Sequence, residues 1–155
     1  MRPSTLWSAN RHRRRGGNIA IETLLFLPLF VLVLAAFVEF AAIQSAQQKL
    51  VRASHAGAKA ASEGADLRQI REVVDVNLGP GALGRHREIK VAMVVHTPHG
   101  EHMVPVNHPE RLPARTPVVV QICAPAAKVA PNLLRSVGFN LSDDELSGET
   151  VMWKE

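Results

Sequence analysis

The sequence has a single cysteine, Cys123, and none of the common catalytic signatures. One cysteine excludes an intramolecular disulfide and a paired-cysteine metal or redox site. Cys123 ends the apolar run 118–123, so we expect a buried small side chain rather than a nucleophile. A serine nucleophile elbow, a phosphate-binding loop, a paired-histidine zinc motif and a dinucleotide turn are all missing. We therefore expect a protein that is not an enzyme and needs no cofactor.

Acidic residues are missing from residues 1–17, which carry five arginines, including the cluster Arg13, Arg14 and Arg15. The 155-residue chain has a formal net charge of +4. Subtracting the five arginines of residues 1–17 leaves a net charge of −1 for residues 18–155. The excess positive charge thus belongs to the N-terminal tail alone. This distribution argues against a nucleic-acid partner.

Charged residues are also missing from residues 24–38. With residues 19–21, and up to Ile43 if Glu39 is tolerated, the apolar stretch covers about 25 positions, or about 37 Å of helix. This length exceeds the hydrocarbon core of a bilayer, about 30 Å thick. The excess of basic residues before the stretch predicts a cytoplasmic N-terminus and an outward-facing remainder. Pro28 is expected to bend the helix.

An acid, Glu22, stands at the entrance of this apolar stretch, five residues after Gly17. Two alternatives explain this order less well. A cleaved secretory signal normally has no charged residue at the entrance of its apolar stretch, and a plain single-pass anchor gives no role to Gly17 or Glu22. A charge alone in lipid costs several kcal/mol, so Glu22 calls for a partner. Glu39 lies roughly 25 Å further along the helix. It is a possible second intramembrane acid that either pairs or reaches water at the outer interface.

This order of features resembles the TadE-like family, pilin-like minor proteins of the Flp (Tad) type IVb pilus system of bacteria. The segments that carry the resemblance are 17–22 (Gly-x4-Glu), 27–29 (Leu-Pro-Leu), 38–40 (Val-Glu-Phe), the Ala/Gln-rich stretch 46–53, and 57–61 (Gly-Ala-x-Ala-Ala). The resemblance covers about residues 14–62. Thr23 departs from it, since the family usually has an aromatic or large apolar residue there.

The resemblance implies a minor pseudopilin. A prepilin peptidase would cut between Gly17 and Asn18 on the cytoplasmic side, and Glu22 would pair with the new terminal ammonium of a neighbouring subunit during docking. The implied partners are this peptidase, other pilins or pseudopilins with the Tad assembly machinery, and the lipid bilayer. The implied location is the bacterial inner membrane, with the C-terminal domain periplasmic or extracellular, and the pilus after assembly.

Residues 44–62 contain no proline and are rich in good helix formers, which predicts one helix continuing out of the membrane. Mostly small residues recur at helical spacing along it: Ala46, Leu50, Ala53, Gly57 and Ala60. Such a face permits close approach, either to the protein's own domain or to another subunit's helix.

The rest of the chain predicts an α+β domain with a small antiparallel sheet and short helices. Asp66 and Gln69 form a capping box for a helix that ends at Gly79. Strands are expected over 88–95, 116–124 and 148–154, with a short strand near 103–106 and a short helix over 131–137. The expected organisation is a leader (1–17), a transmembrane helix (18–43), a juxtamembrane helix (44–62) and an outer domain (63–155).

Three histidines, His96, His99 and His102, lie close together in a proline-containing turn region. Imidazole is a common metal ligand, so they are weak metal candidates. No regular scaffold fixes their geometry, and we expect an exposed polar loop without a metal. Two other functions stay open beside the pseudopilin: an unprocessed, membrane-anchored binding module facing outward, and a tethered metal-binding or enzymatic domain that uses this loop.

Overall fold

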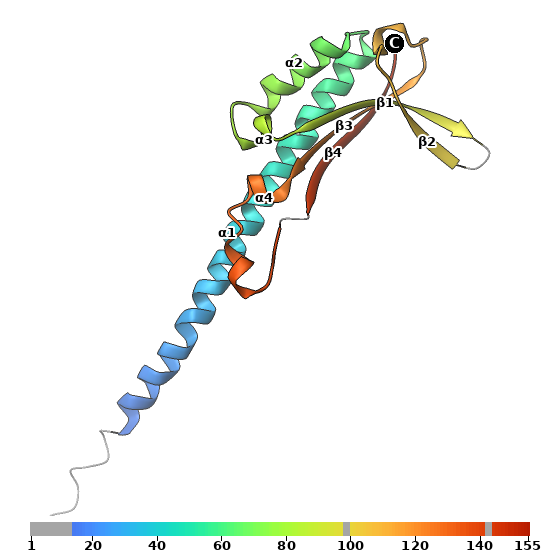
Figure 1. Ribbon diagram of the computed structural model, residues 1–155. Coiled ribbons are helices and arrows are strands. Elements are labelled where there is room, and N and C mark those ends of the chain that lie inside the picture. Colours follow the sequence, from blue (N-terminus) through green and yellow to red (C-terminus); the bar gives the residue numbers. More distant parts are fainter. Residues whose placement is uncertain (1–13, 98–99, 142–143) are drawn as a thin grey trace, which may run out of the picture.

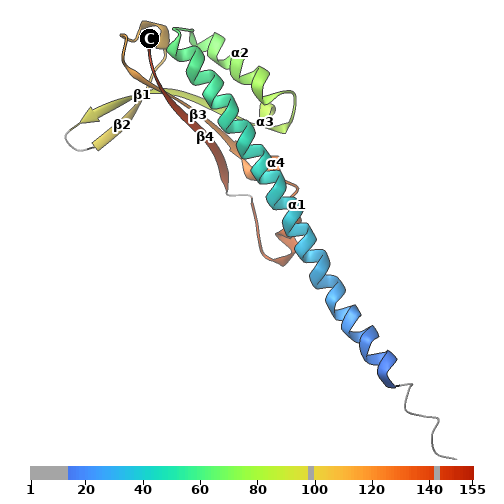
Figure 2. The same cartoon turned by 180° about the vertical axis from the view of Figure 1, so that it is seen from behind.

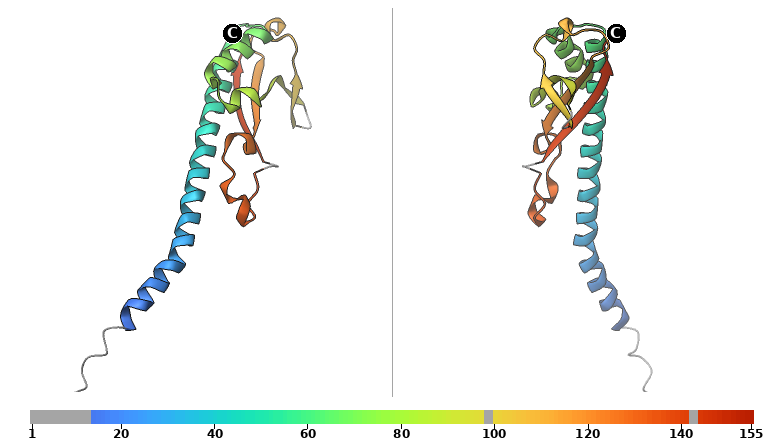
Figure 3. Two further views of the ribbon diagram at one scale, coloured as in Figure 1. Left: turned by 60° about the vertical axis from the view of Figure 1, so that its left-hand side comes forward. Right: turned by 90° about the vertical axis from the view of Figure 1, so that its right-hand side faces the viewer.

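One long helix, α1 (Arg14–Ser62), runs along the whole described part of the protein (Figure 1). The computed structural model describes residues 14–97, 100–141 and 144–155. At about 1.5 Å per residue, the 49 residues of α1 extend roughly 74 Å. The helix continues through Pro28 without interruption and bends in its N-terminal third (Figure 3). The predicted continuation from the apolar stretch into residues 44–62 is therefore confirmed.

A four-stranded antiparallel sheet packs on the C-terminal half of α1, and the predicted α+β class is confirmed. Its order is β2 (Gly100–Pro105), β1 (Glu88–Thr97), β3 (Pro117–Pro125) and β4 (Glu145–Trp153). Figure 2 shows α1 crossing the sheet over β3 and β4, whereas the β1–β2 hairpin projects away from the helix. The three predicted main strands are present, and the short one lies at 100–105 rather than 103–106.

A second helix, α2 (Leu67–Leu78), folds back along α1. The predicted capping box is formed: the Asp66 side chain accepts from the Gln69 N–H, and the Gln69 side chain accepts from the Asp66 N–H. Ile70, Val74 and Leu78 are buried on the predicted face. Gly79 ends the helix at φ 71°, a left-handed value that favours glycine.

The core lies between α1, α2 and one face of the sheet. The small-residue face of α1 points into it: Ala46, Leu50 and Ala53 are buried against the protein's own domain. Gly57 sits where three elements meet, because a Cβ there would come within 2.8 Å of Val74 in α2 and 3.2 Å of Val120 in β3. Of the two partners that the sequence left open for this face, the intramolecular one is realised.

Short elements complete the domain. Two of them were not predicted from the sequence, α3 (Ala82–Arg85) and α4 (Ala126–Val129), and a 3₁₀ turn, η1 (Pro109–Arg111), lies between β2 and β3. The expected helix over 131–137 is a shorter 3₁₀ turn, η2 (Leu133–Val137), followed by Gly138 at φ 95°. Pro131 does not start this helix, because Asn132 adopts a left-handed conformation just after it.

Candidate functional site

The predicted cleavage site lies in the first turns of α1. Gly17 and Asn18 have helical backbone, as do Arg14 and Arg15, whereas Arg13 lies outside the described residues. Glu22 follows one turn later and is exposed. Gly17, Asn18 and Glu22, whose spacing suggested the site, therefore lie on one uninterrupted helix.

Beyond Glu22, α1 exposes apolar side chains all around its circumference. Every residue from Ile21 to Leu34 is exposed, so no other described part of the chain covers a face of this segment. The large apolar side chains exposed on α1 up to residue 40 are Ile21, Leu24, Leu25, Phe26, Leu27, Leu29, Phe30, Val31, Leu32, Val33, Leu34, Phe37, Val38 and Phe40. A helix that is apolar all around is a core helix or a membrane span, and this one has no core around it.

Among the residues described, one helix is long and apolar enough to cross a membrane. It covers Ile21–Ser62, with a mean hydropathy of 2.6 in its best window. The domain packs only on the C-terminal half of this helix (Figure 3). The exposed apolar half is therefore the part available to lipid.

The acid Glu39 marks the point where the two halves of α1 meet. Its side chain is only 4% exposed, and its Oε2 accepts a hydrogen bond of 3.0 Å from the backbone N–H of Leu134 in η2. Glu39 thus has a main-chain hydrogen-bond partner within the protein's own domain, and its role as a second intramembrane acid stays a prediction. Sequence reasoning missed the partner because it lies 95 residues away and is a main-chain group, which leaves no residue-type signal.

The weak metal candidates lie around the β1–β2 hairpin. His96 of β1 is opposite Glu101, and His102 of β2 is opposite Val95, so these two histidines are not register partners. His99 lies outside the described residues. Within those residues, no group of three His, Cys, Asp or Glu side chains is arranged to hold a metal ion.

Cys123 of β3 is buried, as the sequence predicted. Burial raises the pKa of its thiol, and the nearby Glu145 carboxylate raises it further. A raised pKa leaves less thiolate, the nucleophilic form, at neutral pH. The environment of Cys123 therefore opposes a role as a nucleophile.

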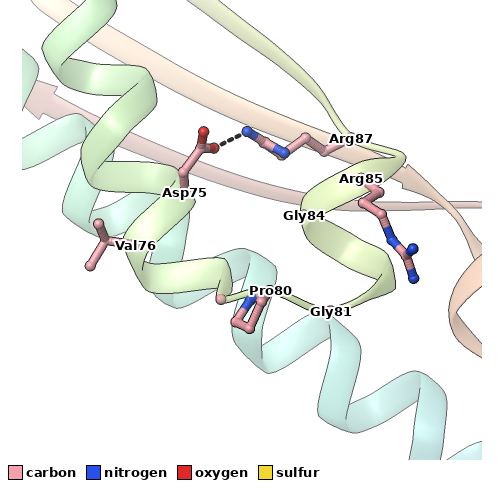
Figure 4. Close-up of a pocket in the computed structure, with 8 residues that line it drawn as sticks. Asp75, Val76, Pro80, Gly81, Gly84, Arg85 and Arg87 are labelled. Atoms are coloured by element: carbon pink, nitrogen blue, oxygen red, sulfur yellow. Dashed lines mark hydrogen bonds and ion pairs between the residues drawn. The ribbon is translucent and has the colours of Figure 1, made fainter.

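A shallow hollow lies where α2 turns into α3 (Figure 4). Gly79, Gly81 and Gly84 are among the residues that line it. Gly84 lies close to the main chain of Gly79, because a Cβ on Gly84 would meet the Gly79 carbonyl oxygen at 2.7 Å. Arg87 forms an ion pair with Asp75 across one side of the hollow. This pair ties α2 to the start of β1, and the arginine is thereby engaged in holding the fold.

A lysine near the C-terminus is buried and was also missed from the sequence. Lys154 Nζ donates to the carbonyl oxygens of Pro109, at 2.9 Å, and Glu110, at 2.8 Å. These contacts fasten the η1 segment to the end of β4. The role is structural, since both acceptors are main-chain groups of the protein itself.

Comparison with known proteins identifies the N-terminal segment. Residues 17–59 match a family model described as TadE-like protein, which confirms the resemblance over this segment. The match begins at Gly17 and ends within the domain-packed half of α1. No curated protein and no solved structure matches the chain. The family match and the candidate membrane helix together indicate a single-pass membrane component associated with Tad pili.

Proposed function

We propose that this protein is a minor pseudopilin of a Tad pilus, a structural and assembly component rather than an enzyme. The observation that carries the proposal is the TadE-like match beginning at Gly17, on a helix whose next turns are apolar and uncovered. In the membrane, lipid covers this surface. In an assembly, the helices of other pilins or pseudopilins replace the lipid.

Maturation starts with cleavage between Gly17 and Asn18 by a prepilin peptidase on the cytoplasmic side. The local chemistry supports access to this bond. Gly16 and Gly17 each weaken a helix by roughly 0.5–1 kcal/mol relative to alanine, and helix ends fray. The first turn of α1 can therefore open so that a protease reaches the main chain.

Cleavage creates an ammonium group at Asn18, one turn before Glu22. The Glu22 carboxylate then pairs with the terminal ammonium of a neighbouring subunit. Such a pair is worth more in lipid than in water, because a charge left alone there costs several kcal/mol. Since a misplaced neighbour would leave both charges unpaired, the pair sets the register of docking.

In this topology the arginine-rich leader is cytoplasmic, and the domain formed by α2 and the sheet lies outside the inner membrane. The preference of Lys and Arg for the cytoplasmic side supports that orientation. One face of the C-terminal half of α1 is occupied by its own domain, so this face is closed to other subunits. The apolar half of α1 is the larger uncovered apolar surface and therefore the main contact with neighbouring helices.

The test is mass spectrometry of the mature N-terminus in cells that contain a prepilin peptidase. We expect a terminus at Asn18, and Gly17→Ala should abolish cleavage. Gly16→Ala is the matched control and should leave the terminus at Asn18. An intact Met1, or a cut near Ala42, would contradict the proposal and favour an unprocessed anchor or a secretory signal.

A further inference from the structure

We propose that residues 131–141, here called the dipping loop, insert into the outer interface of the bilayer beside α1. This inference goes beyond the pseudopilin function: it needs α1 to span the membrane but needs neither cleavage nor assembly. Figure 3 shows the loop at the end of the domain that faces the apolar half of α1. It holds η2, and η2 contacts α1 directly.

The depth of the loop follows from its hydrogen bond to α1. Leu134 donates to Glu39, and Glu39 lies about 30 Å along the helix from Ile19, the first apolar residue of the stretch. That distance equals the thickness of a typical hydrocarbon core. The dipping loop is therefore held at the level where the hydrocarbon meets the outer headgroups.

The side chains of the loop suit this level. Leu133, Val137 and Phe139 are 45%, 50% and 70% exposed, although all three are large and apolar. Arg135 is exposed among them. Residues 126–141 contain Lys128 and Arg135 but no acid. Apolar side chains mixed with cations are typical of segments that lie in an anionic lipid interface.

The loop presents these side chains from a fixed turn. The Gly138 N–H donates to the Arg135 carbonyl, and the Phe139 N–H donates to the Leu134 carbonyl at 3.2 Å. Gly138 has φ 95°, which lets the chain reverse there. Leu134, in the middle of the turn, is anchored to Glu39. Because the turn is already held in place, little conformational entropy is lost when lipid covers it.

Lipid is the occupant best supported by these contacts, because the loop continues the uncovered apolar surface of α1. The same surface could instead be covered by another subunit. The two occupants can be distinguished with lipids that carry a nitroxide quencher. If lipid covers the loop, the nitroxide comes close to residue 139; if another subunit covers it, only protein does.

The experiment uses the full chain in phosphatidylethanolamine and phosphatidylglycerol vesicles, at high dilution of protein in lipid. Cys123→Ala removes the native thiol, and Phe139→Cys carries an environment-sensitive fluorophore. Lipids with a nitroxide near the headgroup should quench this label about threefold more than a label at Val76→Cys on α2. Val76 is the matched control, since it is apolar and exposed and belongs to α2, a helix that lies away from the dipping loop (Figure 1). Leu133→Cys should repeat the result of Phe139→Cys.

Two further arms complete the test. Arg135→Glu should reduce quenching at Phe139→Cys in the anionic vesicles, because the headgroups then repel the loop. Leu29→Cys, in the middle of the apolar half, should be quenched by deep nitroxides. A label at Phe139→Cys that behaves like Val76→Cys, or that is shielded from water yet unquenched by lipid, overturns the proposal. If Leu29→Cys is not quenched by deep nitroxides, α1 does not span the membrane, and the pseudopilin topology is contradicted as well.

Discussion

Gly148 of β4 lies directly against the main chain of Leu50 in α1. A Cβ atom on Gly148 would stand 2.5 Å from the Leu50 carbonyl carbon and 2.7 Å from its carbonyl oxygen. Main-chain atoms of a helix cannot move aside as the end of a flexible side chain can. One turn further on, the Ser54 and Thr150 hydroxyls form a 2.8 Å hydrogen bond. These two contacts fix the edge strand of the sheet to the helix that leads to the membrane.

We therefore expect Gly148→Ala to lower the free energy of unfolding by about 1–3 kcal/mol, the range for overpacking a tight contact. Gly81→Ala is the control, because a Cβ there meets no atom within 4 Å. Thermal unfolding of the full chain in detergent, followed by circular dichroism, measures both. Equal stability of the two variants would show that α1 and β4 separate easily.

Local patterns in the sequence were enough to predict the secondary structure that depends on neighbouring residues. The capping box at Asp66 and the strand alternation around Val91 involve residues within a few positions of each other. The short helical elements were harder to predict from the sequence. Asn132 has a left-handed backbone conformation, at φ 46°, that its neighbours Pro131 and Leu133 do not predict. As a result, η2 begins later than expected.

The partner of Glu39 could not be predicted for a different reason. A main-chain N–H exists at almost every residue, so the sequence does not distinguish Leu134 from other donors. Lys154, whose acceptors are main-chain carbonyls, poses the same problem. By contrast, the roles predicted for Gly17 and Glu22 depend on their spacing and on the apolar residues after them, which the sequence shows directly. Those roles stay predictions.

Cys123 offers a prediction that depends on pH. Burial and Glu145 raise the pKa of its thiol in the folded state. In the unfolded chain the pKa of the thiol is about 8.5. Above that pH the unfolded state binds fewer protons than the folded state, so stability falls as pH rises. The stabilising contribution is fully present below about pH 8.5 and is lost as pH rises through the folded-state pKa.

Unfolding at several pH values between neutral and alkaline should show this loss, and Cys123→Ala should reduce it. Alkylation by iodoacetamide at pH 8 should be at least about tenfold slower for the folded protein than for the protein in denaturant. Equal rates in the two states would mean that the thiol is neither shielded nor shifted.

Glu39 is expected to hold η2 on α1. Glu39→Ala leaves the Leu134 N–H without its acceptor and should cost about 1–3 kcal/mol of local stability. Glu39→Gln keeps a carbonyl oxygen that can accept the same bond, so it should cost less. Hydrogen exchange at the Leu134 amide measures both variants, with the Ile70 amide, which donates to Asp66 elsewhere in the domain, as an internal reference. Unchanged exchange at Leu134 in Glu39→Ala would contradict the anchoring role.

In the proposed function, Glu22 acts in assembly and is not needed for maturation. Glu22→Ala removes the carboxylate but leaves Gly17 and Asn18 in place, so the peptidase should still release a chain that starts at Asn18. Assembly should fail, because the terminal ammonium of a neighbouring subunit would then be left unpaired in a medium of low dielectric constant. Glu22→Gln should behave like Glu22→Ala, whereas Glu22→Asp should assemble in part, since it keeps the charge on a shorter side chain. The measurement is the amount of mature protein recovered in sheared pilus fractions relative to membranes. Normal recovery of Glu22→Ala in those fractions would show that the pairing with the ammonium does not drive docking, even if cleavage after Gly17 occurs as expected.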